Sequence, residues 1–376
     1  PETTISKEIG AEVRLLDGRL TADVTYYDKY TRDQIVESEL SYLSNYQRVI
    51  INSGKISNKG WEISVSGVPV KVKNFEWKTI FNWSKNNSMV ESLPEGIDKI
   101  QIGSGVYNVK SYAEVGKPYG AIYAKTFKRD AEGYILCQLD GSPKEGQDYE
   151  YLGCVQADWR GGWNNVFRLG NFSFSVMFDF QKGGKFFSQT SIQSSVDGQS
   201  VKSLEGRDAD FFSRKILGES DEERYGFMRP QNANTPTANG QIYPDWGRPK
   251  GVVLPNCRYD EDVEGLAGQQ VLGYCTPERY WMHYTSRDIS RFIYDASYVK
   301  LREITVSYDL PKKWLRKTPF QTFRVAAVGR NIATLFANTP HGLDPQATST
   351  TGNAQGFERG FNLPSATYGF DIKVSF

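Results

Sequence analysis

Short and long connections alternate strictly along this chain, between segments in which every second residue is apolar or aromatic. The connections after Leu16, Gly67 and Leu169 are short, whereas the one after Gln181 runs as far as Arg291. A period of two is that of a β-strand with two different faces. We identify nine such segments, at residues 8–16, 19–30, 60–67, 75–83, 161–170, 172–180, 297–311, 323–332 and 365–376. The pattern predicts an all-β, antiparallel protein.

The longest connections argue against a compact soluble domain, in which structureless loops of that length are uncommon. In transmembrane β-barrels, short turns at one rim and long loops at the other are the rule. The predicted long loops are about 31–57, 88–159, 183–290 and 333–365. The alternative is a soluble β-sandwich with the same aromatic side chains in its core, but a sandwich has turns every 8–12 residues.

One predicted strand shows most clearly which face would meet lipid. Its polar face carries Ser173, Ser175 and Asp179, as a water-filled lumen requires. Its other face is too aromatic to be left in water and is long enough to cross a hydrocarbon layer at a tilt. We therefore predict that five residues face lipid: Phe172, Phe174, Val176, Phe178 and Phe180.

The composition is compatible with such a barrel and excludes other classes of protein. A mean hydropathy of -0.52 and the lack of any long apolar run exclude a transmembrane helix. The formal net charge is +1 and no basic block occurs, so we expect no nucleic-acid partner. The sequence begins with PETTISKEIG, without Met or an apolar signal region, and we expect it to be part of a longer protein.

The last strand ends on an aromatic residue without any tail. A terminal strand of this kind is the type of signal that outer-membrane assembly machinery reads. It must also pair with the first strand of a barrel, because lipid cannot satisfy an open sheet edge. The alternative is an ordinary edge strand of a soluble protein. The predicted assembly signal consists of Tyr368, Phe370, Ile372, Val374 and Phe376.

Several segments together resemble the SusC-like family of TonB-dependent outer-membrane transporters. YDASYVKLREITVSYDLP (294–311) is similar to a characteristic segment of that family, and RVAAVGRNIATLF with PHGLDPQA is similar to its next strand and loop. SNKGWEISVSG, FEWKTIFNWSKNNSMVESL, GKPYGAIYAKTF and the ending NLPSATYGFDIKVSF follow in the family's order. The resemblance implies the carboxyl-terminal strands of a 22-stranded barrel. The family's plug and TonB-interacting segment are not visible in this sequence.

The resemblance also implies a function. Such transporters import oligomeric glycans or peptides, driven through TonB, together with a SusD-like surface lipoprotein. Loops 183–290 and 333–365 are the predicted contact surface for that lipoprotein. The alternatives are a passive porin-like or adhesive barrel, or a soluble β-sandwich binding module.

No catalytic, cofactor or metal site is expected. His283 and His341 are far apart in sequence and lack a convincing nucleophile, so we interpret them as exposed loop residues. Asp344, in the GLDP segment 342–345, is predicted to cap backbone amides in a turn. Four loop aromatic residues could stack on sugar rings, or pack the loop internally or meet the lipoprotein: Trp246, Tyr259, Tyr280 and Trp281.

The four cysteines fall into two pairs of similar spacing in loop-like sequence. Neither pair has the CxxC spacing of a zinc site. We expect the disulfides Cys137–Cys154 and Cys257–Cys275, which would imply an oxidising location. Free thiols are the alternative, since sequence does not determine connectivity.

Overall fold

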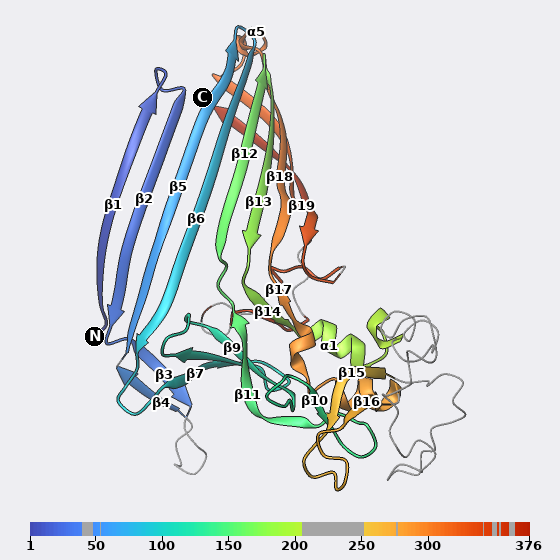
Figure 1. The fold of residues 1–376 in the computed structure, drawn as a ribbon. Coiled ribbons are helices and arrows are strands. Elements are labelled where there is room, and N and C mark those ends of the chain that lie inside the picture. Colours follow the sequence, from blue (N-terminus) through green and yellow to red (C-terminus); the bar gives the residue numbers. More distant parts are fainter. Residues whose placement is uncertain are drawn as a thin grey trace.

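Nine long antiparallel strands form one sheet in the computed structural model, as the residue pattern predicts (Figure 1). The structure describes residues 1–39, 48–52, 54–204, 252–275, 277–340, 342–347, 352, 355–360 and 365–376. In spatial order the strands are β1 (Thr3–Leu15), β2 (Leu20–Arg32), β5 (Lys55–Val72), β6 (Phe75–Ser92), β12 (Trp159–Leu169), β13 (Phe172–Lys182), β18 (Tyr298–Asp309), β19 (Thr322–Ala337) and β21 (Thr367–Ser375). These nine strands occur in the sheet in the same order as in the sequence, so each inner one pairs with the strand before it and the strand after it.

Short connections join the strands at the end of the sheet where the carboxyl terminus lies (Figure 1). Gly170 and Asn171 form the predicted turn between β12 and β13, and Gly170 has a φ of 56°, which glycine adopts without steric cost. The predicted connection 68–74 is wrong, because β5 continues to Val72 and only Lys73 and Asn74 turn the chain. A register shift between Gly67 and Val70 marks a bulge there, which absorbs the irregular sequence around Pro69.

The register divides the sheet into an aromatic face and a polar face. Neighbouring strands bring Trp77 beside Phe167, Phe167 beside Phe174, and Trp163 beside Phe178, with ring centroids 5.8, 6.1 and 5.8 Å apart. Because opposite residues of paired strands point to the same side, these rings form one continuous band.

Two polar groups on the aromatic face are satisfied by indole N–H groups. Trp77 Nε1 donates to Asn165 Oδ1 at 3.0 Å, and Trp163 Nε1 donates to Thr79 Oγ1 at 2.9 Å. Asn165 is only 3% exposed. The band therefore covers an amide that would be costly to leave unpaired in an apolar environment.

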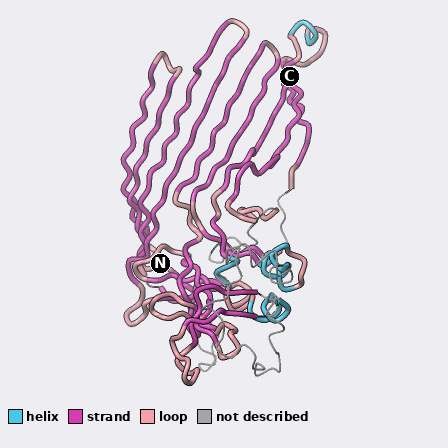
Figure 2. The backbone as a smooth tube through the Cα atoms, turned by 45° about the vertical axis from the view of Figure 1, so that its right-hand side comes forward, coloured by secondary structure: helices cyan, strands magenta, loops and turns pink. Residues whose placement is uncertain are grey.

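Four long connections, 33–54, 93–158, 183–297 and 338–366, join the strands at the opposite end of the sheet. Their described parts gather there and form a loop body (Figure 2). Their strands form four small sheets: β11 (Glu145–Cys154), β9 (Ala121–Phe127), β8 (Lys110–Glu114) and β7 (Lys99–Ser104); β10 (Ile135–Cys137), β15 (Val252–Tyr259) and β16 (Gln270–Cys275); β17 (Ile293–Asp295), β14 (Lys185–Ser188) and β20 (Phe357–Glu358); and β3 (Ile35–Glu39) with β4 (Arg48–Asn52).

Helices are short and lie mainly in the loop body. They are α1 (Gln189–Val196), η2 (Val201–Leu204), α4 (Pro277–Arg279), η3 (Tyr280–Tyr284) and η4 (Ile289–Phe292), with α5 (Lys312–Leu315) between β18 and β19. Among the described residues, none of these helices has the length and apolarity to cross a membrane. The main hydrophobic core lies in the loop body and joins residues from three long connections, including Phe127, Trp281 and Phe357.

Gly60 lies on the polar face at a point where neighbouring strands leave no room for a side chain. A Cβ added there would lie 2.3 Å from the Lys85 carbonyl oxygen and 2.4 Å from the Tyr27 hydroxyl, which donates to Asn86 at 3.1 Å. We expect Gly60→Ala to destabilise the sheet by about 1–3 kcal/mol through overpacking. The matched control is Gly369→Ala on β21, where nothing lies within 4 Å of the added atom. Urea unfolding in detergent measures both variants, and equal stabilities would contradict the predicted close packing.

Candidate functional site: the polar face and the loop body

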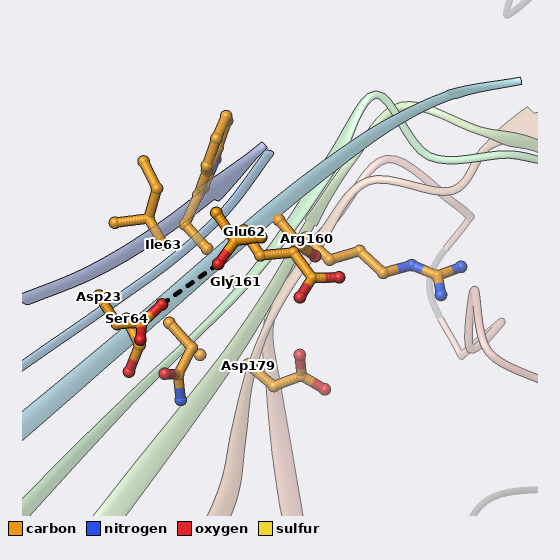
Figure 3. A pocket seen from close by; sticks show the side chains of 12 residues that line it. Asp23, Glu62, Ile63, Ser64, Arg160, Gly161 and Asp179 are labelled. Carbon is orange, nitrogen blue, oxygen red and sulfur yellow. Dashed lines mark hydrogen bonds between the residues drawn. The ribbon is translucent and has the colours of Figure 1, made fainter. Parts of the chain in front are cut away.

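The polar face of the sheet carries an open trough of about 500 Å³. Five strands, β2, β5, β6, β12 and β13, contribute to it because their registers align the side chains in rows across the sheet. Figure 3 shows Asp23, Ser64 and Asp179 on one side of the sheet and Ile63 on the other. The remaining polar lining residues are Thr25, Glu62, Asn82, Ser84 and Arg160. Hydroxyl, amide and carboxylate groups of this kind offer hydrogen bonds to a polar ligand or to polar protein surface.

Two charged groups of the trough are already engaged. Asp179 forms an ion pair with Arg302 of β18, and Arg160 Nε donates to Gln181 Oε1 at 3.0 Å. Both contacts join neighbouring positions on the polar face, so they fix side chains along the wall.

A buried ion pair anchors the GLDP segment to this wall. Lys300 of β18 is 1% exposed, and its Nζ donates to both carboxylate oxygens of Asp344 at 2.5 and 2.6 Å and to Gln346 Oε1 at 2.9 Å. Gln346 Nε2 in turn donates to the Tyr298 hydroxyl at 2.6 Å. The predicted cap is confirmed, since Asp344 Oδ1 accepts from the Gln346 amide at 2.8 Å. The pairing of Asp344 with Lys300 was not predicted, because no local pattern links two residues 44 positions apart.

Three of the four aromatic residues predicted as possible ligand platforms are core residues. Tyr259 is 2% exposed, and Tyr280 and Trp281 are each 1% exposed. Tyr280 and Trp281 pack edge to face, with centroids 5.1 Å apart, inside the loop body. Their rings are therefore closed to a sugar, and the alternative of internal packing is the correct one. Trp246 lies outside the described residues.

One of the two histidines lies within the described residues. His283 is exposed on η3, as predicted, and His341 lies outside the described residues. Among the residues that the structure describes, no group of three His, Cys, Asp or Glu side chains is arranged to hold a metal ion.

An ion cluster ties two long connections together within the loop body. Asp260 is 3% exposed and accepts from Lys144 Nζ at 2.8 Å and from Lys128 Nζ at 2.9 Å. Burial alone would raise the pKa of Asp260, but the hydrogen bonds from Lys144 and Lys128 outweigh it and lower that pKa to about 2. The carboxylate therefore stays charged, and its stabilising contribution is present above pH 4 and is lost as the pH falls towards 2.

The two predicted disulfides are wrong. Cys137, Cys154 and Cys275 are free thiols in the structure, which excludes both Cys137–Cys154 and Cys257–Cys275. The small sheet that contains β10 and β15 instead brings Cys137 close to Cys257, and a hydrogen bond to Cys257 together with burial raises the pKa of the Cys137 thiol. A thiol with a raised pKa in an apolar core is unreactive, so packing decides its role.

The predicted lipid-facing and assembly residues lie on the aromatic face. Phe172 and Phe174 are exposed, and Val176, Phe178 and Phe180 are partly buried. On β21, at one edge of the sheet, the register with β19 places Tyr368, Phe370, Ile372 and Val374 on this same face. Phe376 lies beside Phe320, with centroids 5.3 Å apart. Their roles in lipid contact and assembly stay predictions.

Comparison with known proteins gives a consistent result. The family model of the TonB dependent receptor-like β-barrel matches residues 1–338. TonB-dependent receptor P3 of Formosa agariphila is 24% identical over 98% of this chain and 33% of its own length. TonB-dependent receptor SusC of Bacteroides thetaiotaomicron is 26% identical over 26% of this chain and 10% of its own length. The RagAB peptide importer in its closed-closed state superposes with a TM-score of 0.65 at 16% identity, covering 100% of this chain and 35% of that one.

The nine-stranded sheet is therefore a wall segment of a transmembrane β-barrel. The chain belongs to the TonB-dependent receptor-like β-barrel family. It spans about a third of the length of TonB-dependent receptor P3 and of the RagAB chain that it matches. Within the described residues the sheet is open, with β1 and β21 at its two edges.

The Lys300–Asp344 pair yields a prediction about the loop anchor. Asp344→Ala leaves a buried ammonium without its partner, and we expect a loss of about 3–5 kcal/mol. Lys300→Met should cost less, because Asp344 is 15% exposed and can be hydrated. The double variant should be more stable than Asp344→Ala alone, as thermal unfolding of the three purified variants would show. Additive losses in the double variant would mean that the two side chains do not interact.

Proposed function

We propose that this chain is the barrel wall of an outer-membrane transporter that imports oligomeric nutrients, either glycans or peptides, with energy supplied through TonB. The observation that carries the proposal is the two-faced sheet: one face is a continuous aromatic band and the other is a polar trough. Family membership and the RagAB peptide importer and SusC relatives support import as the activity. A Gram-negative outer membrane is the corresponding location.

The aromatic band would contact lipid acyl chains, and the polar face would look towards the lumen. Short turns would lie on the periplasmic side and the loop body on the outer surface. A SusD-like lipoprotein would contact the loops, with segments 183–290 and 333–365 as the proposed surface. The terminal residues of β21, ending at Phe376, would serve as the assembly signal.

Uptake by cells tests the activity. Cells that express the full-length transporter and its lipoprotein partner should accumulate labelled oligopeptides or oligosaccharides. Deleting TonB, or collapsing the inner-membrane proton gradient, should abolish that uptake. Uptake that persists without TonB would instead indicate a passive pore. Uptake without the lipoprotein would argue against the proposed partnership.

The orientation of the two faces is tested by charge insertion. Phe174 and Met177 are similarly exposed, at 39% and 37%, but lie on the aromatic and polar faces respectively. Phe174→Arg should cost about 2–4 kcal/mol because it places a charge in hydrocarbon, whereas Met177→Arg faces water and should cost much less. Folding into lipid vesicles under urea measures both, and equal costs would contradict the proposed orientation.

A further inference from the structure

β6 and β12 pair along only part of their length. Their ladder begins at Phe75 and Leu169 and ends at Ser84 and Arg160, whereas β6 continues beside β5 as far as Ser92. Figure 1 shows the two strands diverging as they approach the loop body. Beyond Ser84, the side of β6 that faced β12 has therefore lost its neighbouring strand.

The backbone direction of this free edge follows from Val90. Its N–H donates to the Lys117 carbonyl at 3.0 Å and its own carbonyl accepts from Gly116 at 2.9 Å, so both groups point away from β5. Backbone groups alternate sides along an antiparallel strand. The N–H and C=O of Asn86 and Ser88 therefore point the same way as those of Val90. Within the described part of the chain, neither residue has a strand partner on that side.

Open space lies against this edge. A cavity of about 240 Å³ is bordered by Asn86 and Gln156, and a second of about 500 Å³ is bordered by both residues and by Ser88. The smaller cavity also shares Ser84 and Arg160 with the trough on the polar face. We call the region bordered by these residues the β6 notch: Ser84, Asn86, Ser88, Gln156 and Arg160. It opens to the polar face, and the larger of its two cavities, at about 500 Å³, falls in the range of small-ligand pockets, about 300–1,000 Å³.

We propose that the β6 notch binds a short extended stretch of oligopeptide cargo, which pairs with the free edge of β6 as an added strand. This inference rests on the proposed import function and narrows its cargo to peptides. An extended peptide presents an N–H and a C=O on one edge at every second residue, about 6.8 Å apart. Asn86 and Ser88 present the complementary groups at the same interval, which is how β-strand addition binds peptides.

Two features indicate that the occupant of the β6 notch is the imported molecule. The notch is continuous with the polar face, the surface that an imported molecule would pass. Its lining also offers two groups that can contact a peptide. The Oε1 of Gln156 can accept from a peptide N–H, while its Nε2 donates to the Tyr119 carbonyl. The Nη groups of Arg160, whose Nε donates to Gln181, can donate to a terminal carboxylate. A glycan has no ladder of backbone groups at the strand interval to match the free edge.

Removing one backbone donor tests the pairing. Ser88→Pro deletes the N–H that points into the notch and leaves the ladder with β5 intact, since proline is tolerated where an edge N–H is free. Ser88→Ala keeps the N–H and is the matched control. The full-length protein in detergent is assayed with a pool of synthetic random-sequence decapeptides. We expect Ser88→Pro to weaken binding about 3- to 10-fold, the equivalent of one hydrogen bond, and Ser88→Ala to change it less than about twofold. Equal binding by the two variants would overturn the proposal.

A second measurement needs no variant of the protein. The most enriched decapeptide is resynthesised in two forms, with either its odd-numbered or its even-numbered backbone nitrogens methylated. Strand pairing engages alternate residues, so one form should bind at least about threefold more weakly to the wild-type protein while the other binds normally. Equal binding of both forms would overturn the proposal. Retention of oligosaccharides without any peptide would also overturn it while leaving nutrient import intact, whereas loss of all TonB dependence would refute the import function itself.

Discussion

Hydrogen bonds between long neighbouring strands are the interaction on which the rest of this structure depends. In a hydrocarbon layer, every backbone N–H and C=O must find a protein partner. The ladders from β1 to β21 pair most of these groups, except along the part of β6 beyond Ser84 and the outer edges of β1 and β21, and they also determine which side chains share a face. A slip of one residue would exchange the aromatic and polar faces, so the ladder and the segregation of side chains depend on each other.

Two polar groups on the aromatic face are hydrogen-bonded to side chains of that same face. Asn165 is covered and accepts the Trp77 indole N–H, and Thr79 accepts that of Trp163. Tryptophan suits this task because its ring is apolar while its N–H can satisfy a neighbour. The band can thus contain an amide and a hydroxyl without leaving either oxygen unpaired on the aromatic face.

The loop body is stabilised differently from the sheet. Its core draws residues from three long connections, and buried charges link segments that are far apart in sequence, as Lys144 with Asp260 and Lys300 with Asp344 illustrate. Such pairs stabilise little relative to apolar packing, but they are expensive to break once buried. They hold the long connections in one arrangement beside the polar face. The β6 notch lies at the junction, where the wall ends and the loop body begins.

The nine strands, their two faces and the turn at Gly170 and Asn171 were predictable from the sequence, because alternation and turn chemistry are local properties of neighbouring residues. The burial of Tyr259, Tyr280 and Trp281, the proximity of Cys137 to Cys257, the Lys300–Asp344 pair and the free edge of β6 were not predictable. Each depends on which distant segments meet, and period-two alternation carries no information about that. Only the packing of the long connections against each other and against the wall decides it.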